Sequence, residues 1–244
     1  MRILPLLSLA IITVASADSP KICVEDAWPP FAMVEKGRPA GAMVELVAAA
    51  YAQSGITPRF ESGSYNRCLK LTLQGEYDGL LDVARNSERV PQFVWSTRPI
   101  LIMKLHLVGH AGLPPEAPSY AAMRGRKVGM TTGYEYPDAM LSQPGLVRVE
   151  SSSELGNFRQ LAQGKIDFML LSEGTLATML AALPPAQRKA IRDWGVIDEL
   201  PLFVAFYKDG LQAEDYSTAL DHGLEVVQRS GQQQAIMRKW KAVP

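Results

Sequence analysis

The chain has 244 residues, of which 47% are hydrophobic and 20% are charged, and its 25 basic and 25 acidic residues give a formal net charge of zero. This composition excludes disordered, collagen-like and low-complexity chains, and no basic run suited to nucleic acid is present. The cysteine count of 2 is too small for a disulfide scaffold or a Cys-rich metal site. We therefore expect a globular protein without a metal, a cofactor or a nucleic-acid partner.

The first 17 residues have the three parts of a secretory signal peptide. Met1 and Arg2 form a positive n-region, residues 3–14 are mostly apolar, and residues 15–17 (Ala-Ser-Ala) offer small side chains for cleavage. The apolar run is shorter than the ~20 residues of a membrane span. We predict cleavage before Asp18 and export of a soluble protein to the periplasm; an uncleaved anchor is the alternative.

Strands and helices alternate along the rest of the chain. Hydrophobic periodicity and Gly, Pro and Ser boundaries predict strands at residues 21–24, 57–61, 77–83, 100–108, 127–130, 147–149, 166–171 and 202–207. The same signals predict helices at 42–51, 67–73, 136–141, 155–162, 175–183, 185–192, 213–230 and 232–240. The prolines of residues 28–31 predict a loop. This alternation is typical of βαβ units, and it predicts an α/β fold with mostly parallel sheets.

A weak internal repeat indicates two lobes. Residues 73–81 resemble residues 161–171: each has a helix end, a glycine, an acidic residue and an apolar strand. Gly75 and Gly164 are expected to supply the left-handed conformation that ends a helix. Two lobes built on one plan can place the ends of their strands at a shared cleft.

Cys23 and Cys68 have two readings in an exported protein. An oxidising compartment favours a disulfide, which would tie the first strand to the second helix. The alternative is a pair of buried free thiols. A catalytic cysteine is not expected, because the three histidines, His106, His110 and His222, are scattered along the sequence.

Four stretches resemble the periplasmic solute-binding proteins that bind polar amino acids for ABC importers, the bacterial solute-binding protein family 3. These stretches are residues 28–31 (WPPF) with Gly41, residues 65–78, residues 86–96 and residues 126–133. The resemblance covers essentially all of residues 18–244. It implies a type II fold of two α/β lobes with two crossovers, near residues 104–109 and 202–208, that closes by hinge motion. Lobe 1 would comprise residues 18–104 and 208–244, and lobe 2 residues 105–207.

The resemblance also implies a ligand site. Arg89 stands where the family places the arginine that binds a ligand carboxylate, a task that suits a planar, permanently charged guanidinium. Thr131-Thr132-Gly133 leads into a predicted helix, whose first N–H groups suit an anion. Trp28 and Tyr65 are the expected aromatic walls. The alternatives are a surface arginine, ordinary packing of the two rings, and N-capping by threonine.

The sequence departs from the family pattern where a ligand ammonium group would bind. The aspartate of the family falls on Ser172, and Glu173 follows it. Glu173, Asp82 or Glu25 would have to replace that aspartate from another direction. Otherwise the ligand lacks an α-ammonium group.

A second departure lies on the strand before the arginine. Small or hydroxylated residues of the family become Asp82 and Ala84. A buried Asp82 without a cationic partner would be costly. It therefore suggests a cation, supplied either by the ligand or by a neighbour such as Arg85.

These residues support three hypotheses on function. The first is a monomeric binding protein for a small polar solute, an amino acid or a related carboxylate, which it delivers to the membrane permease of an ABC importer. The second is a periplasmic sensory or accessory module with a degenerate pocket that signals to a protein partner. The third is a lyase similar to cyclohexadienyl dehydratase, with Glu173 or Asp82 as a positioned acid. We favour binding, and we assign no catalytic residue.

Overall fold

The computed structural model describes residues 19–114 and 117–242. The predicted signal peptide and its cleavage site lie outside the described residues. Within the two described ranges, no helix combines the length and the apolar character needed to cross a membrane.

The elements that the structure describes largely follow the predicted alternation. The strands are β1 (Lys21–Glu25), β2 (Ala27–Trp28), β3 (Ala32–Glu35), β4 (Arg38–Ala40), β5 (Arg59–Gly63), β6 (Gly79–Ala84), β7 (Phe93–Trp95), β8 (Leu101–His110), β9 (Lys127–Thr131), β10 (Val147–Ser151), β11 (Phe168–Ser172) and β12 (Ile191–Tyr207). The α-helices are α1 (Ala42–Ala52), α2 (Tyr65–Leu73), α3 (Asp138–Leu141), α4 (Glu154–Ala162), α5 (Glu173–Ala182), α6 (Pro185–Arg188), α7 (Ala213–Arg229) and α8 (Gln232–Lys239). Two short 3₁₀ helices, η1 (Val90–Gln92) and η2 (Tyr120–Met123), complete the described elements.

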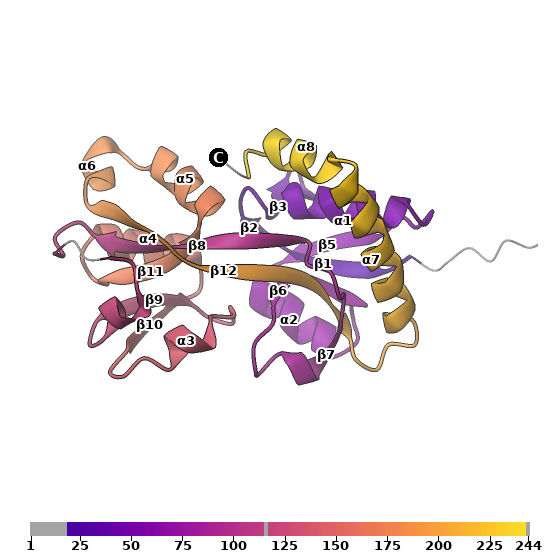
Figure 1. Cartoon of the computed structure of the whole chain (residues 1–244), viewed down its shortest axis with the longest axis horizontal. Helices are drawn as coiled ribbons and strands as arrows, with labels where there is room; N and C mark the ends of the chain where they lie inside the picture. Colours follow the sequence, from indigo (N-terminus) through magenta and orange to yellow (C-terminus); the bar gives the residue numbers. More distant parts are fainter. Residues whose placement is uncertain (1–18, 115–116, 243–244) are drawn as a thin grey trace, which may run out of the picture.

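One large sheet runs through both halves of the molecule, with β8 and β12 at its centre (Figure 1). Its strand order is β10-β9-β11-β8-β12-β6-β1-β5, and β7 also pairs with β12. The pairs β1–β5, β1–β6, β9–β10 and β9–β11 are parallel. β8 and β12 are antiparallel to each other and to the strands beside them. The predicted α/β fold is therefore confirmed, with two antiparallel strands between two parallel sets.

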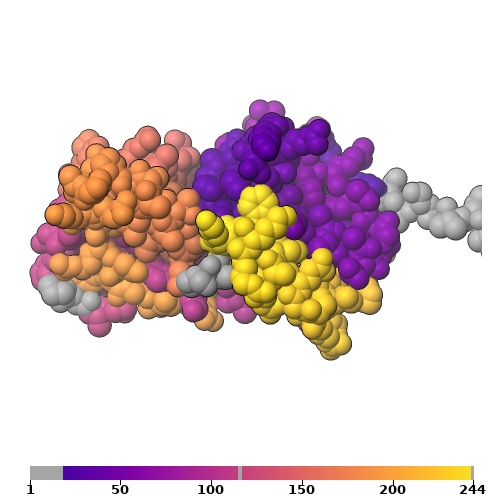
Figure 2. Space-filling view, turned by 90° about the horizontal axis from the view of Figure 1, so that it is seen from above, coloured from indigo at the N-terminus to yellow at the C-terminus, as the bar shows by residue number. Residues whose placement is uncertain are grey.

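The strands β8 and β12 connect two lobes. Lobe 1 contains β1–β7 with α1, α2, α7 and α8, and lobe 2 contains β9–β11 with α3–α6 (Figure 1). In the space-filling view the two lobes lie side by side, and the yellow C-terminal helices cover part of lobe 1 (Figure 2). Residues 202–206 of β12 pair with β6 of lobe 1. The predicted boundary at 207/208 remains a prediction, and these pairings favour a position before residue 202.

The N-terminal part of β12 differs from the sequence prediction. Residues 185–192 were expected to be helical, but α6 ends at Arg188 and β12 begins at Ile191. The pairing of residues 191–201 with the apolar strand β8 forms this part of the strand. Its own sequence mixes charged residues with Gly195, and its register shifts twice between Asp193 and Asp198, so local hydrophobicity did not reveal it.

Close helix packing forms the outer side of lobe 1. Helices α1 and α7 bury their apolar faces against each other, with Ala50 and Tyr51 among the fully buried residues of α1. At Gly223 of α7, an added Cβ would lie 1.9 Å from the carbonyl oxygen of Ala50. This contact explains the glycine, since any side chain there would force the two helices apart.

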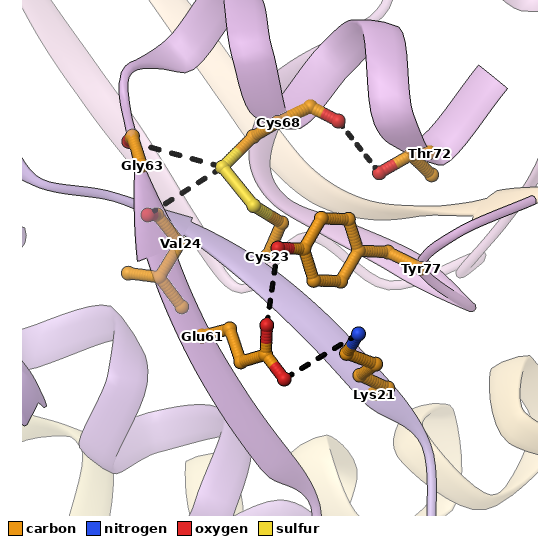
Figure 3. Close-up of a disulfide and its surroundings, with 8 residues drawn as sticks. All are labelled: Lys21, Cys23, Val24, Glu61, Gly63, Cys68, Thr72 and Tyr77. Carbon is orange, nitrogen blue, oxygen red and sulfur yellow. Dashed lines mark hydrogen bonds and ion pairs between the residues drawn. A yellow bond between two sulfur atoms is a disulfide. The ribbon is translucent and has the colours of Figure 1, made fainter. Parts of the chain in front are cut away.

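A disulfide between Cys23 and Cys68 ties β1 to α2, with a Cα–Cα distance of 5.4 Å (Figure 3). The predicted pairing is thus present, and the alternative of two free thiols is not. Beside it, the hydroxyl of Tyr77 donates a hydrogen bond to Glu61, and Lys21 forms an ion pair with Glu61 at 3.4 Å (Figure 3). The disulfide connects the strand that carries Glu25 to the helix that begins at Tyr65.

The two segments of the internal repeat end their helices in the same way. Gly75 after α2 has φ +77°, and Gly164 after α4 has φ +68°. Both are the left-handed residues that the repeat predicted. In each lobe the chain then enters a buried parallel strand, β6 in lobe 1 and β11 in lobe 2. The repeat therefore places β6 and β11 on opposite sides of the crossing strands.

Candidate functional site

A pocket lies between the two lobes. It opens to solvent, and its empty volume of about 550 Å³ includes part of that open solvent. Lobe 1 contributes Glu25, Trp28, Tyr65, Asp82 and Ala84. The crossing strands contribute Met103, Leu105, Leu200 and Leu202. Lobe 2 contributes Tyr134, Glu135, Tyr136, Pro137, Glu154, Leu170, Leu171 and Ser172.

The structure brings half of the predicted ligand-binding residues to this pocket. Those that line it are Glu25, Trp28, Tyr65, Asp82 and Ser172. Arg89 lies behind this group, in contact with Glu135 of the pocket wall. Whether each of these side chains contacts a ligand stays a prediction.

Aromatic side chains form two walls of the pocket. Trp28, on β2, is buried, and its ring centroid lies 4.7 Å from that of Phe31. The indole Nε1 of Trp28 is buried and has no hydrogen-bond partner. Tyr65 and Tyr134 meet edge to face across the cleft, with their ring centroids 5.1 Å apart. Burial raises the pKa of both tyrosines well above its ordinary value, so both hydroxyls remain neutral donors.

Asp82 is a buried carboxylate without a partner. It lies on β6, and both of its carboxylate oxygens are buried and accept no hydrogen bond from a described residue. Burial, with the charges of Glu25 and Glu135, raises its pKa well above the usual range. Its backbone φ of +64° is in the left-handed region, which few non-glycine residues adopt within a strand. Strained backbone and an unpaired charge together are typical of functional sites.

Two further carboxyl groups face the pocket. Glu25 is the last residue of β1 and accepts a hydrogen bond of 2.5 Å from the hydroxyl of Tyr134. Burial raises the pKa of Glu25 to about 7, although the bond from Tyr134 opposes this shift. Glu154 begins α4, and its Oε2 is buried without a partner. Burial, with the charge of Glu25, raises the pKa of Glu154 well above its ordinary value.

Arg89 already holds a carboxylate of this chain. Its Nε donates to Oε1 of Glu135 at 2.7 Å, and the side chain of Glu135 is only 5% exposed. The hydroxyl of Tyr65 donates to the second oxygen of Glu135 at 2.6 Å. Nη1 of Arg89 also pairs with the exposed Glu88 at 2.5 Å. The guanidinium that the resemblance assigns to a ligand carboxylate is thus occupied from the opposite lobe.

The expected anion site at Thr131-Thr132-Gly133 has a different structure. The helix predicted at residues 136–141 is present as α3, but it begins at Asp138, so four residues separate it from Gly133. The N–H of Thr131 donates to the hydroxyl of Tyr136, and the N–H of Thr132 donates to the carbonyl of Ser151. Gly133, at φ +87°, turns the chain toward the pocket. None of these three residues lines the pocket.

Three other residues considered in the sequence analysis have surroundings of their own. Ser172 caps α5, since its hydroxyl accepts from the N–H of Thr175 at 3.1 Å. Glu173 lies on a separate hollow beside Phe31, and not on the main pocket. Arg85 donates to the carbonyl of Ser96 at 2.6 Å and stacks on Phe203, 4.0 Å from its ring centroid. The suggestion that Arg85 neutralises Asp82 is therefore wrong.

Most of the lobe 2 wall of the pocket was not predicted from the sequence. Beside the predicted Ser172, its polar members are Tyr134, Glu135, Tyr136 and Glu154. A signal was present, because an acidic residue between two tyrosines directly follows the turn at Gly133. That Glu135 reaches Arg89, 46 residues away in sequence, needed the fold.

Comparison with known proteins identifies related folds. The model of the family "Bacterial extracellular solute-binding proteins, family 3" matches residues 21–243. Among curated proteins, none matches this chain.

Several solved structures share the architecture. A histidine kinase sensor domain with similarity to periplasmic binding proteins has a TM-score of 0.76 at 21% identity, over 91% of this chain and 95% of that one. An ancestral arginine-binding protein bound to arginine has a TM-score of 0.75 at 18% identity, over 91% and 97%. The arginine-, lysine-, histidine-binding protein ArtJ from Geobacillus stearothermophilus has 0.75 at 16%, over 93% and 96%. At these identities the likeness shows the fold alone.

Proposed function

Because the chain belongs to family 3 of the bacterial extracellular solute-binding proteins, we propose that its pocket binds a small polar solute and that the loaded protein delivers it to the permease of an ABC importer. The protein acts as a monomer in the periplasm after loss of residues 1–17. Lobe 1 and lobe 2 close over the solute, with β8 and β12 as the hinge.

The observation that carries this proposal is the unpaired polar lining of the pocket. Both oxygens of Asp82, the Nε1 of Trp28 and Oε2 of Glu154 are buried and make no hydrogen bond within the described residues. A buried polar group without a partner costs about 1–3 kcal/mol. A pocket that carries several such groups is a site where a bound molecule would supply the missing partners.

Contacts across the cleft support closure of the two lobes. Glu25 of lobe 1 accepts from Tyr134 of lobe 2, and Arg89 and Tyr65 of lobe 1 hold Glu135 of lobe 2. Each contact joins side chains from different lobes, so opening the cleft to admit a solute would break them all. Their re-formation would favour the closed state once the solute is bound.

A sensory or accessory module is the second candidate. It is favoured by the pairing of Glu135 with Arg89, because a pocket that satisfies its own arginine resembles one that no longer takes an amino acid. Such a module would pass a signal to a membrane protein rather than deliver a solute. A lyase on this scaffold has less support, because its carboxylate substrate would need the arginine that Glu135 holds.

A thermal-shift panel on the mature protein, stripped of ligand by unfolding and refolding, tests the proposed function. The panel contains the common amino acids, di- and polyamines, choline and small dicarboxylates. A solute at ~100 times its Kd should stabilise the protein by about 2.7 kcal/mol, which is roughly 5–10 °C for a chain of this size. Ala84→Leu, which adds bulk inside the pocket, should abolish the shift, and Ala177→Leu, which adds the same bulk on an exposed face of α5, should not.

Two outcomes would contradict solute binding. One is no shift with any member of the panel; the other is a shift that Ala84→Leu leaves unchanged. If Ala84→Leu melts too early to be read, Trp28→Phe tests the same wall with a smaller change. Silence across the panel together with binding to a membrane protein would favour the sensory module.

A further inference from the structure

The described lining of the pocket contains acidic side chains but no basic ones. Four carboxyl groups line it, those of Glu25, Asp82, Glu135 and Glu154, and no lysine, arginine or histidine is among its described lining residues. The guanidinium of Arg89, which contacts Glu135 of the pocket wall, is engaged by Glu135 and Glu88. The described lining therefore offers a further anion no cationic side chain of its own.

The four carboxyl groups differ in what they contact. Glu135 has Arg89 and Tyr65, and Glu25 has the hydroxyl of Tyr134. Asp82 has no hydrogen-bond partner on either oxygen, and Glu154 has none on Oε2. Asp82 is 6% exposed, so water does not replace the missing donors freely. These vacant acceptors call for N–H donors that carry positive charge.

Glu135 takes the place that a ligand carboxylate would need. Its two oxygens receive Nε of Arg89 at 2.7 Å and the hydroxyl of Tyr65 at 2.6 Å. Both donors come from lobe 1, while Glu135 comes from the loop after β9 in lobe 2. A ligand carboxylate could reach Arg89 only by expelling this buried side chain.

The remaining walls suit the body of an organic cation. Trp28, Tyr65 and Tyr134 present aromatic rings, which attract cations through their π-faces. Met103, Leu105 and Leu170 supply an apolar surface for a hydrocarbon chain. The unpaired Nε1–H of Trp28 can donate to an oxygen or a neutral nitrogen of the same molecule.

We infer that the pocket recognises a small organic cation without a free carboxylate, a primary amine or a guanidine, whose N–H groups bind Asp82 while Glu135 fills the carboxylate position at Arg89. This inference rests on the proposed function, solute binding in the same pocket. Glu25 and Glu154 flank the cation. Specificity against amino acids comes from Glu135, which repels and physically excludes their carboxylate.

Matched pairs of solutes test the inference. Agmatine is arginine without its carboxylate, and cadaverine is lysine without its carboxylate. Isothermal titration of the stripped wild-type protein should give each decarboxylated member a Kd at least tenfold lower than that of its amino acid. Equal or tighter binding of the amino acids would overturn the inference and leave solute binding intact. Absence of binding by these four and by the whole thermal-shift panel would overturn both.

Variants of Asp82 and Glu135 test the roles assigned to these two residues. Asp82→Asn keeps the shape of the side chain and should weaken the tightest-binding amine at least tenfold, whereas Glu76→Gln, on an exposed acid outside the pocket, should leave its Kd unchanged. Glu135→Ala frees Arg89 and should tighten the binding of arginine at least tenfold. Glu135→Gln, which keeps the volume, serves if the alanine variant does not fold. An unchanged amine Kd in Asp82→Asn, or unchanged amino-acid binding in folded Glu135 variants, would overturn the assignment of these residues.

Discussion

Arg89 and Asp82 are both buried at the cleft between the lobes, with exposures of 8% and 6%, but their surroundings differ. Arg89 is held by carboxylates from both lobes, Glu88 and Glu135. Asp82 has no hydrogen-bond partner at all among the described residues. Within one cleft, the guanidinium of Arg89 thus has its partners, and the carboxyl group of Asp82 has none within the described part of the chain. The arginine that the family uses for a ligand can therefore be retained while another residue of the same chain binds it.

The largest expected effect comes from breaking the ion pair between Arg89 and Glu135. Arg89→Ala leaves Glu135 buried without a cation, with only the hydroxyl of Tyr65 as its side-chain partner among the described residues, so we expect a loss of about 3–5 kcal/mol in the free energy of unfolding. Adding Glu135→Ala should recover part of that loss, since the orphaned carboxylate is then gone. Urea denaturation of both single variants and the double variant measures this. Arg98→Ala is the control, because its ion pair with Glu225 is exposed and should be worth less than about 1 kcal/mol. Equal losses in Arg89→Ala and Arg98→Ala would contradict a tightly held pair.

The second effect is a pH dependence of the free energy of unfolding, caused by the buried carboxyl groups of the pocket. The pKa of Glu25 is raised from 4.5 to about 7 in the folded protein by burial, with Asp26 and Glu135 adding to the rise and Tyr134 opposing it. The folded state then binds more protons than the unfolded state between these values, so stability should fall as the pH rises from about 4.5 to about 7. The expected loss is on the order of 3 kcal/mol.

Denaturation midpoints across this pH range check that dependence. The pKa values of Asp82 and Glu154 are also raised by burial, so they contribute to the same slope. Glu25→Gln should therefore reduce the slope without abolishing it, and Glu76→Gln should leave it as in the wild type. Stability that rises from pH 5 to pH 7 in the stripped protein would contradict buried, unpaired carboxyl groups.

A smaller effect of opposite sign is expected at Asp82 itself. Asp82→Asn removes a buried carboxyl group that has no hydrogen-bond partner within the described ranges and whose pKa is raised by burial, and asparagine tolerates the left-handed φ of +64°. We expect a gain of about 1–2 kcal/mol in the stability of the stripped protein at pH 8. Asp78→Asn is a matched control, since its Oδ2 accepts the N–H of Lys21 at 2.8 Å and its loss should destabilise. If both substitutions destabilise the protein equally, Asp82 has a structural partner and the comparison fails.

The smallest expected effect measures how much the hydrogen bond from Tyr65 to Glu135 contributes to stability. Tyr65→Phe removes the hydroxyl that donates to Glu135 but keeps the ring. We expect a loss of about 1–2 kcal/mol, the usual value of a hydrogen bond to a charged group. Tyr77→Phe removes a bond of 3.2 Å to Glu61 and should cost less, because that acid is exposed. A larger loss for Tyr77→Phe would show that Glu135 depends on Arg89 alone.

Much of the fold followed from local sequence. The strands and helices around Cys23, Gly75 and Gly164 have hydrophobic periods and glycine stops that hold within a few residues of the chain. The first half of β12 lacks such a period, and it is a strand because β8 pairs with it. The helix predicted at residues 136–141 begins only at Asp138, because the chain from Gly133 to Pro137 forms a loop that the hydrogen bonds of Thr131 and Thr132 hold in place.

The candidate site likewise has a part that local sequence predicted and a part that depends on tertiary structure. Trp28, Tyr65 and Asp82 were named from lobe 1 motifs, and all three line the pocket. The resemblance assigns Arg89 to a ligand carboxylate, whereas in the structure it is buried and its Nε donates to Glu135 of the same chain. Glu135 lies in a short loop whose sequence carries no period, and only the closed arrangement of the lobes brings it to Arg89. Pairing between lobes is a property of tertiary structure, so the sequence pattern of one lobe could not reveal it.

The most direct test of this account is the preference between agmatine and arginine, measured by titration on the stripped wild-type protein and on Glu135→Ala. The account predicts that the wild type binds agmatine at least tenfold more tightly than arginine, and that Glu135→Ala loses or reverses this preference. A wild-type protein that binds arginine more tightly, through an Arg89 that Glu135 readily yields, would contradict it.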